Sequence, residues 1–159
     1  MKAFEKNVKI SMAYHIQPYI FKDAFATYGF TNVVGDPLNL DTLNNVKAGG
    51  FGYLGNPLKT PWDSTYTHFN DVKSLGVDSI FVGHEHCNSA SMVYQGVRLQ
   101  YGQKSSRYDR FNSLTTENTI VGGHNVQGIA LIGGTVFSLS MMDGTILNPY
   151  IYYAGMPTS

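Results

Sequence analysis

Charged residues are scarce in this chain, and their scarcity argues against one class of partner. They make up 14% of the 159 residues, and 11 Lys and Arg balance 11 Asp and Glu, so the net charge is zero. Globular domains usually contain about 25% charged residues. Because a protein that binds nucleic acid concentrates Lys and Arg on its surface, this neutral chain gives no indication of a nucleic-acid partner.

Cysteine and long apolar runs are also lacking. The single cysteine, Cys87, excludes an internal disulfide framework and leaves the cellular compartment undecided. No apolar run reaches the roughly 20 residues of a membrane span, and no signal-peptide pattern is visible, so no membrane partner is expected. The length suits one domain with its own core. The 11 Tyr and 9 Phe indicate that part of its surface packs against a partner.

The predicted elements follow the order β-α-loop-α-β and then continue as mostly antiparallel strands, which is typical of the α/β class. The first half predicts a strand over residues 8–15, a helix over 18–28 that ends at Gly29, a helix over 65–75 and a strand over 77–82. The second half predicts a hairpin over residues 91–101 and strands over 128–132, 135–141 and 145–153. Residues 35–62 are predicted to be irregular, either a substrate-facing loop or a plain surface excursion.

Two histidines follow the central predicted strand. The apolar run at residues 77–82 ends in Gly83, and His84 and His86 come directly after it. His15 ends another predicted strand, and ligands of α/β sheets bind beyond the carboxyl ends of the strands. Imidazole is a common ligand of transition metals, so the three histidines predict a metal site. The alternative is one histidine in solvent and one hydrogen-bonded in the core. His68 is predicted to lie on the solvated surface.

A family resemblance is carried by these same motifs. Gly83-His84-Glu85-His86, after Ile80-Phe81-Val82, resembles the Gly-His-x-His motif of the calcineurin-like metallophosphoesterases, with Glu85 where the family usually has Asp. Asn88 and the stretches at residues 13–19 and 96–104 are similar to the purple-acid-phosphatase-like branch, in which the histidine of the first stretch is a metal ligand. The resemblance covers residues 8 to 111, in the order and spacing of the family.

The resemblance implies a hydrolase of phosphoesters, a phosphatase or phosphodiesterase, with an α/β/β/α sandwich and a mixed sheet whose C-terminal portion is antiparallel. It implies two divalent or trivalent metal ions (Fe, Mn or Zn) that share the task of activating a water. His15 and His84 would bind one metal and His86 the other. Glu85 is expected in solvent or in contact with a ligand, and not as a ligand itself.

The chain also departs from the family. The N-terminal Asp-x-His, Gly-Asp and Gly-Asn-His motifs have no counterpart, because Gly35-Asp36 follows His15 and is predicted to be a turn. Residues 1–159 are therefore expected to form a single partial domain, the C-terminal half of a catalytic domain. Alone it would hold metal partially or not at all and would lack efficient activity. Its partners would be the missing N-terminal half or a second copy, because one strand edge and an apolar face would be left bare.

Two other functions remain open from the residues. The chain could be a non-enzymatic fragment or degenerate paralogue that acts as an assembly module. It could also be a mononuclear zinc hydrolase with His15, His84 and His86 as ligands, and Glu85 or Asp36 as base. Three further residues are candidates with weaker signals: Cys87 as a soft ligand or a small buried hydrophobe, and Lys104 and Arg107 as phosphate contacts.

Overall fold

The computed structural model describes residues 8–30, 38–39, 47–54, 58, 61, 63–86, 88–103, 105, 118–121, 124–127 and 132–153. Two helices lie within these residues, α1 (Ile20–Tyr28) and α2 (Thr67–Ser74). The strands are β1 (Ile10–Ala13), β2 (Leu38–Asn39), β3 (Phe51–Leu54), β4 (Val77–Val82), β5 (Asn88–Tyr94), β6 (Val97–Tyr101), β7 (Asn118–Val121), β8 (His124–Gln127), β9 (Gly133–Leu139) and β10 (Ile146–Tyr153). With 9 and 8 residues, both described helices are too short to cross a membrane.

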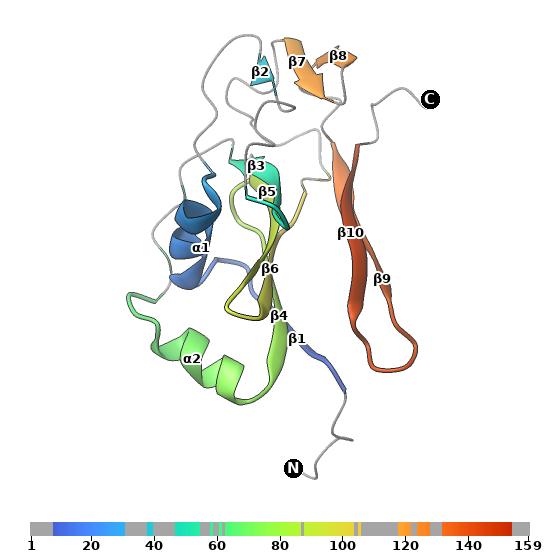
Figure 1. Ribbon diagram of the computed structural model, residues 1–159. Coiled ribbons are helices and arrows are strands. Elements are labelled where there is room, and N and C mark those ends of the chain that lie inside the picture. The colour runs from blue at the N-terminus through green and yellow to red at the C-terminus, as the bar shows by residue number, and fades with distance from the viewer. Residues whose placement is uncertain are drawn as a thin grey trace.

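A five-stranded sheet forms the centre of the molecule (Figure 1). Its strand order is β1-β4-β6-β5-β3, with β1, β4 and β6 parallel and β5 and β3 antiparallel to their neighbours. The predicted α/β class with a mixed sheet is therefore confirmed. The hairpin of β5 and β6 turns at Gln95 and Gly96, whose φ angles of 49° and 83° are those of a tight two-residue turn.

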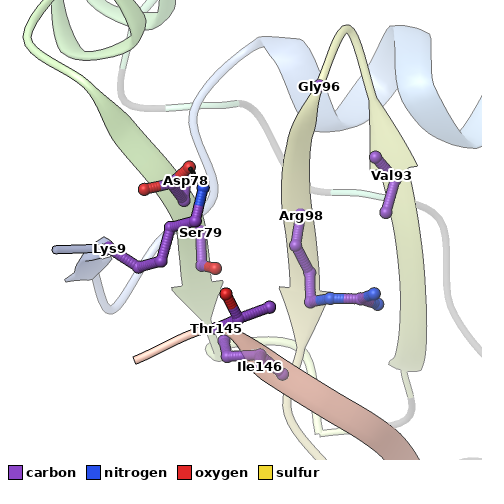
Figure 2. Close-up of a pocket in the computed structure, with 8 residues that line it drawn as sticks. All are labelled: Lys9, Asp78, Ser79, Val93, Gly96, Arg98, Thr145 and Ile146. Carbon is purple, nitrogen blue, oxygen red and sulfur yellow. Dashed lines mark hydrogen bonds and ion pairs between the residues drawn. The ribbon is translucent and has the colours of Figure 1, made fainter. Parts of the chain in front are cut away.

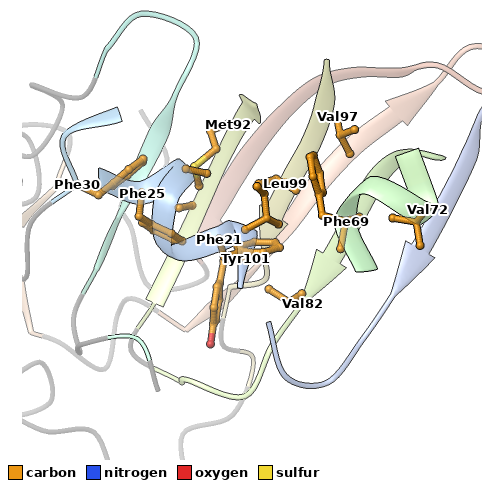
Figure 3. Packing of buried hydrophobic residues seen from close by; sticks show 14 of the residues in the cluster. Phe21, Phe25, Phe30, Phe69, Val72, Val82, Met92, Val97, Leu99 and Tyr101 are labelled. Atoms are coloured by element: carbon orange, nitrogen blue, oxygen red, sulfur yellow. The ribbon is translucent and has the colours of Figure 1, made fainter. Parts of the chain in front are cut away.

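Both helices cover one face of this sheet, and the apolar core lies between the two layers (Figures 1 and 3). Phe21 and Phe25 of α1 pack edge-on against the ring of Tyr101 at centroid distances of 6.3 and 6.4 Å. Leu99, on the same strand as Tyr101, is fully buried between them and α2. Helix α1 ends, as predicted, at Gly29, which takes a left-handed φ of 81°.

The antiparallel hairpin of β9 and β10 lies on the other side of the sheet (Figure 1). The rings of Phe137 on β9 and Phe81 on β4 are 5.3 Å apart, and Lys9 N donates to Asp143 O at 2.9 Å. The register of the hairpin shifts between Leu147 and Tyr150, around Pro149, which has no backbone N–H to donate to the partner strand. Strands β2, β7 and β8 form a separate three-stranded sheet.

The sheet face below the hairpin is mostly polar. Alternation along β5 and β6 places Ser91, Arg98 and Gln100 on this face, and Arg98 Nη1 donates to Ser91 Oγ at 2.8 Å. Exposed apolar side chains are concentrated on the hairpin, where Met141 and Met142 at its tip are 98% and 96% exposed. The expected bare edge is present: β1 pairs only with β4 among the described strands.

Strand β3 lies in the stretch that the sequence predicts to be irregular. Its four residues pair with β5, from Phe51 opposite Ser91 to Leu54 opposite Asn88. Gly52 is required there, because its φ is 108° and a Cβ would lie 2.1 Å from the carbonyl oxygen of Ser89. The glycine that suggests a loop in the sequence is the residue that lets the two strands approach.

Candidate metal centre

The backbone of two parallel strands brings His15 and His84 to the same end of the sheet. Past the end of β1, Tyr14 N donates to Phe81 O at 2.9 Å, and Gly83 N donates to His15 O at 3.1 Å. These two bonds extend the pairing of β1 with β4 beyond the regular strands. The prediction that both histidines follow neighbouring strand ends is thus realised in the fold.

The two imidazole rings contact each other directly. His84 Nδ1 lies 3.1 Å from His15 Nε2, and the ring centroids are 4.9 Å apart at an angle of 81°. Which nitrogen donates to the other depends on the tautomers of the two rings. The His84 side chain is 35% exposed and His15 lies at the surface, so a solute can reach the pair.

The backbone of His84 adopts a conformation that few non-glycine residues take. Its φ is 80°, in the left-handed region, whereas Gly83 before it has no positive φ. The sequence suggests that the glycine makes the sharp turn, and the structure assigns the turn to the histidine. Residues held in such conformations cost of order 1–3 kcal/mol and concentrate at functional sites. The ring of His84 reaches His15 because of this turn.

Glu85 is buried beside the pair and does not extend into solvent. It is 6% exposed, and its Oε1 lies 3.8 Å from His84 Nε2, too far for a hydrogen bond but close enough for an ion pair. The sequence-based alternatives for Glu85 were solvent or contact with a ligand residue, and the structure selects the contact. His84 therefore faces His15 with one ring nitrogen and a carboxylate with the other.

Tyr101 fixes the turn that contains these residues. Its hydroxyl accepts a hydrogen bond from Glu85 N at 2.8 Å, and its ring is fully buried against α1. Burial raises the pKa of this hydroxyl above its ordinary value of 10.0, so Tyr101 is a neutral phenol. Sequence reasoning missed this role; the signal was an aromatic residue at the carboxyl end of the next parallel strand.

The third predicted ligand, His86, is not brought into the same cluster. It lies exposed in the turn between β4 and β5. Among the described residues, no three His, Cys, Asp or Glu side chains come together closely enough to hold a metal ion. Four residues named as candidates in the sequence lie outside the described residues: Asp36, Cys87, Lys104 and Arg107.

His68 is only partly exposed, in contrast to its predicted place on the solvated surface. Its Nε2 lies 2.9 Å from the hydroxyl of Tyr14, and the two rings meet edge to face with their centroids 5.4 Å apart. This histidine links α2 to the segment that follows β1. It offers a natural control for experiments on the other histidines.

The distance between the two facing ring nitrogens is close to that between two nitrogen ligands of one metal ion. Two imidazole nitrogens at about 2.0–2.1 Å from a tetrahedral zinc ion are about 3.3 Å apart. The observed 3.1 Å between His84 Nδ1 and His15 Nε2 is close to that separation. A ligating histidine usually directs its other ring nitrogen to a carboxylate or carbonyl, and Glu85 lies on that side of His84.

Comparison of the chain with family models, curated proteins and solved structures found no match.

Proposed function

We propose that this chain supplies metal ligands to a dinuclear centre for phosphoester hydrolysis. The single observation that supports the proposal most directly is the 3.1 Å approach of His84 Nδ1 to His15 Nε2 at the carboxyl ends of two parallel strands. The sequence around them, Gly83-His84-Glu85-His86, carries the family resemblance. The substrate of the complete centre would be a phosphoester, and this chain alone would have little activity.

The chain's own residues have distinct tasks in this proposal. His15 and His84 would hold one ion of the Fe, Mn or Zn type, and His86 would serve a second ion together with ligands from outside the described residues. A bound metal ion of this kind polarises a phosphoryl oxygen and lowers the pKa of a coordinated water. Glu85 orients the His84 ring through the 3.8 Å contact, and Tyr101 holds the backbone of Glu85.

Metal binding tests the ligand set. Zn²⁺ or Mn²⁺ affinity is measured by competition with a chromophoric chelator in the wild type, His15→Ala, His84→Ala and His86→Ala. We expect the loss of either member of the pair to weaken binding by about tenfold or more, since each contributes a direct ligand. His68→Ala is the matched control, because His68 contacts Tyr14 and lies outside the pair. Equal metal affinity in the wild type and in the His15→Ala and His84→Ala variants would contradict the proposed metal site.

Hydrolysis is tested separately from metal binding. An aryl phosphate monoester and diester are offered to the metal-loaded chain, with phosphate binding to that chain as a second readout. Slow, metal-dependent hydrolysis or phosphate binding that disappears in His84→Ala supports the phosphoesterase function. The chain could instead bind metal through His15 and His84 but neither bind phosphate nor accelerate hydrolysis. That result would support the metal centre and contradict the phosphoesterase function.

A second candidate function, assembly, is favoured by the hairpin of β9 and β10. Its exposed side chains include Leu139, Tyr150 and Tyr152, besides the two methionines of its tip. Both strands pair only with each other among the described residues. An exposed apolar ribbon of this kind is a common site of self-association. Sedimentation velocity of Met141→Lys/Met142→Lys tests it: a dimer that dissociates supports assembly through the tip, and a monomeric wild type excludes it.

A further inference from the structure

A cavity of about 180 Å³ lies between β10 and the polar face of the five-stranded sheet (Figure 2). It lies beside the amino-terminal half of β4, at Asp78 and Ser79, whereas His84 follows the carboxyl end of that strand. The cavity and the histidine pair are therefore separate sites, and the cavity does not depend on the proposed metal centre. Thr145 and Ile146 of the hairpin segment form its wall opposite the sheet.

Asp78 carries the one carboxylate in the lining of the cavity, and its charge is balanced by Lys9. Oδ1 of Asp78 lies 3.1 Å from Lys9 Nζ, and Oδ2 accepts a hydrogen bond from Ile10 N at 3.2 Å. Both oxygens thus have donors, and the charges of Asp78 and Lys9 cancel. The balance of charge in the cavity is set by its remaining charged side chain, Arg98.

Arg98 has no counter-ion in the described part of the chain. Its guanidinium extends from β6 toward β5 (Figure 2), and its Nη1 donates to the neutral hydroxyl of Ser91 at 2.8 Å. Partial burial lowers the pKa of Arg98, because the charged form is favoured by water. A guanidinium carries five N–H donors in a planar fork, so Ser91 leaves most of them available. Arg98 is only partly buried, so a solute from outside can reach the donors that Ser91 leaves.

We propose that this cavity binds a small oxyanion, a carboxylate or phosphate group, with Arg98 as its principal contact. The guanidinium fork matches the two oxygens of such a group, which is the geometry of the strongest charge-assisted hydrogen bonds. The cavity of about 180 Å³ is open to solvent and has room for a small group of this kind. The nearly buried Ser79 also lines the cavity and offers a hydroxyl to the same ligand.

The ligand would also join the hairpin to the sheet. The cavity is bounded by Arg98 of the sheet and by Thr145 and Ile146 of the hairpin segment. Near the cavity, a backbone bond from Lys9 N to Asp143 O at 2.9 Å connects these layers. An anion held between the layers would add a contact that spans them. Binding is therefore expected to raise the thermal stability of the whole chain.

The test is a titration of the full chain with acetate and, separately, with phosphate. Ionic strength is held constant with sodium chloride, and EDTA is present so that no metal is bound. The amide signals of Ser79 and Gly96 and the Nε–H signal of Arg98 are followed by ¹⁵N-resolved NMR. We expect saturable shifts of these three signals with at least one of the two anions, and the anion that saturates identifies the ligand class.

Three variants decide the role of Arg98. Arg98→Gln should weaken anion binding by about tenfold or more. Arg98→Lys keeps the charge but lacks the planar guanidinium, so its anion affinity should lie between those of Arg98→Gln and the wild type. Lys47→Gln removes an exposed cation away from the cavity and should leave the affinity unchanged. Shifts that fail to saturate with both anions overturn the proposal. So does an Arg98→Gln chain with a dispersed, folded spectrum and wild-type affinity.

Discussion

The two faces of the five-stranded sheet hold their neighbouring layers by different means. On the helix side, Leu99 and Tyr101 are fully buried in one apolar cluster with Phe21 and Phe25. On the hairpin side, the buried groups are polar, and the aromatic contact of Phe81 with Phe137 is supplemented by single hydrogen bonds. Stabilisation scales with apolar area removed from water at about 25 cal/mol per Å². The helix layer is therefore expected to be the more firmly attached of the two.

This difference separates the stable part of the molecule from the part that can respond to a ligand. The histidine pair lies at the end of strands that are anchored in the apolar cluster through Tyr101. The Arg98 cavity lies under the hairpin, where fewer apolar contacts hold the layers together. Regions with little buried apolar surface open at lower free energy than the core. A site of the first kind suits fixed metal ligands, and a site of the second kind suits a ligand that tightens the fold.

The largest effect is expected from truncating a core residue on the helix side. Leu99→Ala should lower the free energy of unfolding by about 2–5 kcal/mol, since it leaves a cavity in a fully buried cluster. Val93→Ala is the matched change on the hairpin side, where the side chain is 41% exposed. It should cost less than about 1 kcal/mol. Urea denaturation followed by circular dichroism gives both values, and equal losses would contradict the proposed difference between the faces.

Much of the helix side could be predicted from the sequence. The positions of Phe21 and Phe25 at i and i+4, the helix stop at Gly29 and the tight turn at Gln95-Gly96 are local signals, and all of them are confirmed. The approach of His15 to His84 was also predictable, because both follow strands that end at the same edge of a sheet.

The rest depends on contacts between distant residues. Strand β3 was missed because Gly52 suggests a loop until Ser89 is seen to lie against it. The left-handed φ of His84 and the burial of Glu85 follow from how Tyr101 holds the turn, which no local pattern encodes. The polar side chains on the hairpin side, Ser91, Arg98 and Gln100, were not singled out from the sequence, because their common face depends on how β5 and β6 pair.

A smaller effect is expected where the apolar cluster meets the histidine turn. Tyr101→Phe keeps the ring and removes the hydroxyl that accepts from Glu85 N, which should cost about 1 kcal/mol of stability. Because Glu85 then loses its anchor beside His84, we also expect weaker Zn²⁺ binding. Tyr53→Phe is the control: its hydroxyl donates to Gln103 Oε1 at 3.0 Å, away from the pair. If both variants bind Zn²⁺ like the wild type, Tyr101 does not position the site.

The smallest effect is expected at the turn of the hairpin, where a carboxylate is held by local bonds. Hydrogen bonds from Thr145 Oγ1 and Thr145 N, at 2.6 and 3.0 Å, lower the pKa of Asp143 from its usual 3.8 to about 2. Because the pKa is lower in the folded state, the stabilisation is present above about pH 4 and is lost as the pH falls through about 2.

The Thr145→Val variant tests this assignment through the carboxyl carbon of Asp143, followed by NMR against pH. The midpoint should move from about 2 towards 3.8, because the hydroxyl contribution is the largest of the causes. Thr135→Val makes the same change elsewhere on the hairpin, at the hydroxyl that accepts from Gln103 N. It should leave the midpoint of Asp143 in place. A midpoint near 3.8 in the wild type would mean that the turn of the hairpin opens in solution, and that the hairpin layer is held even more loosely than its contacts indicate.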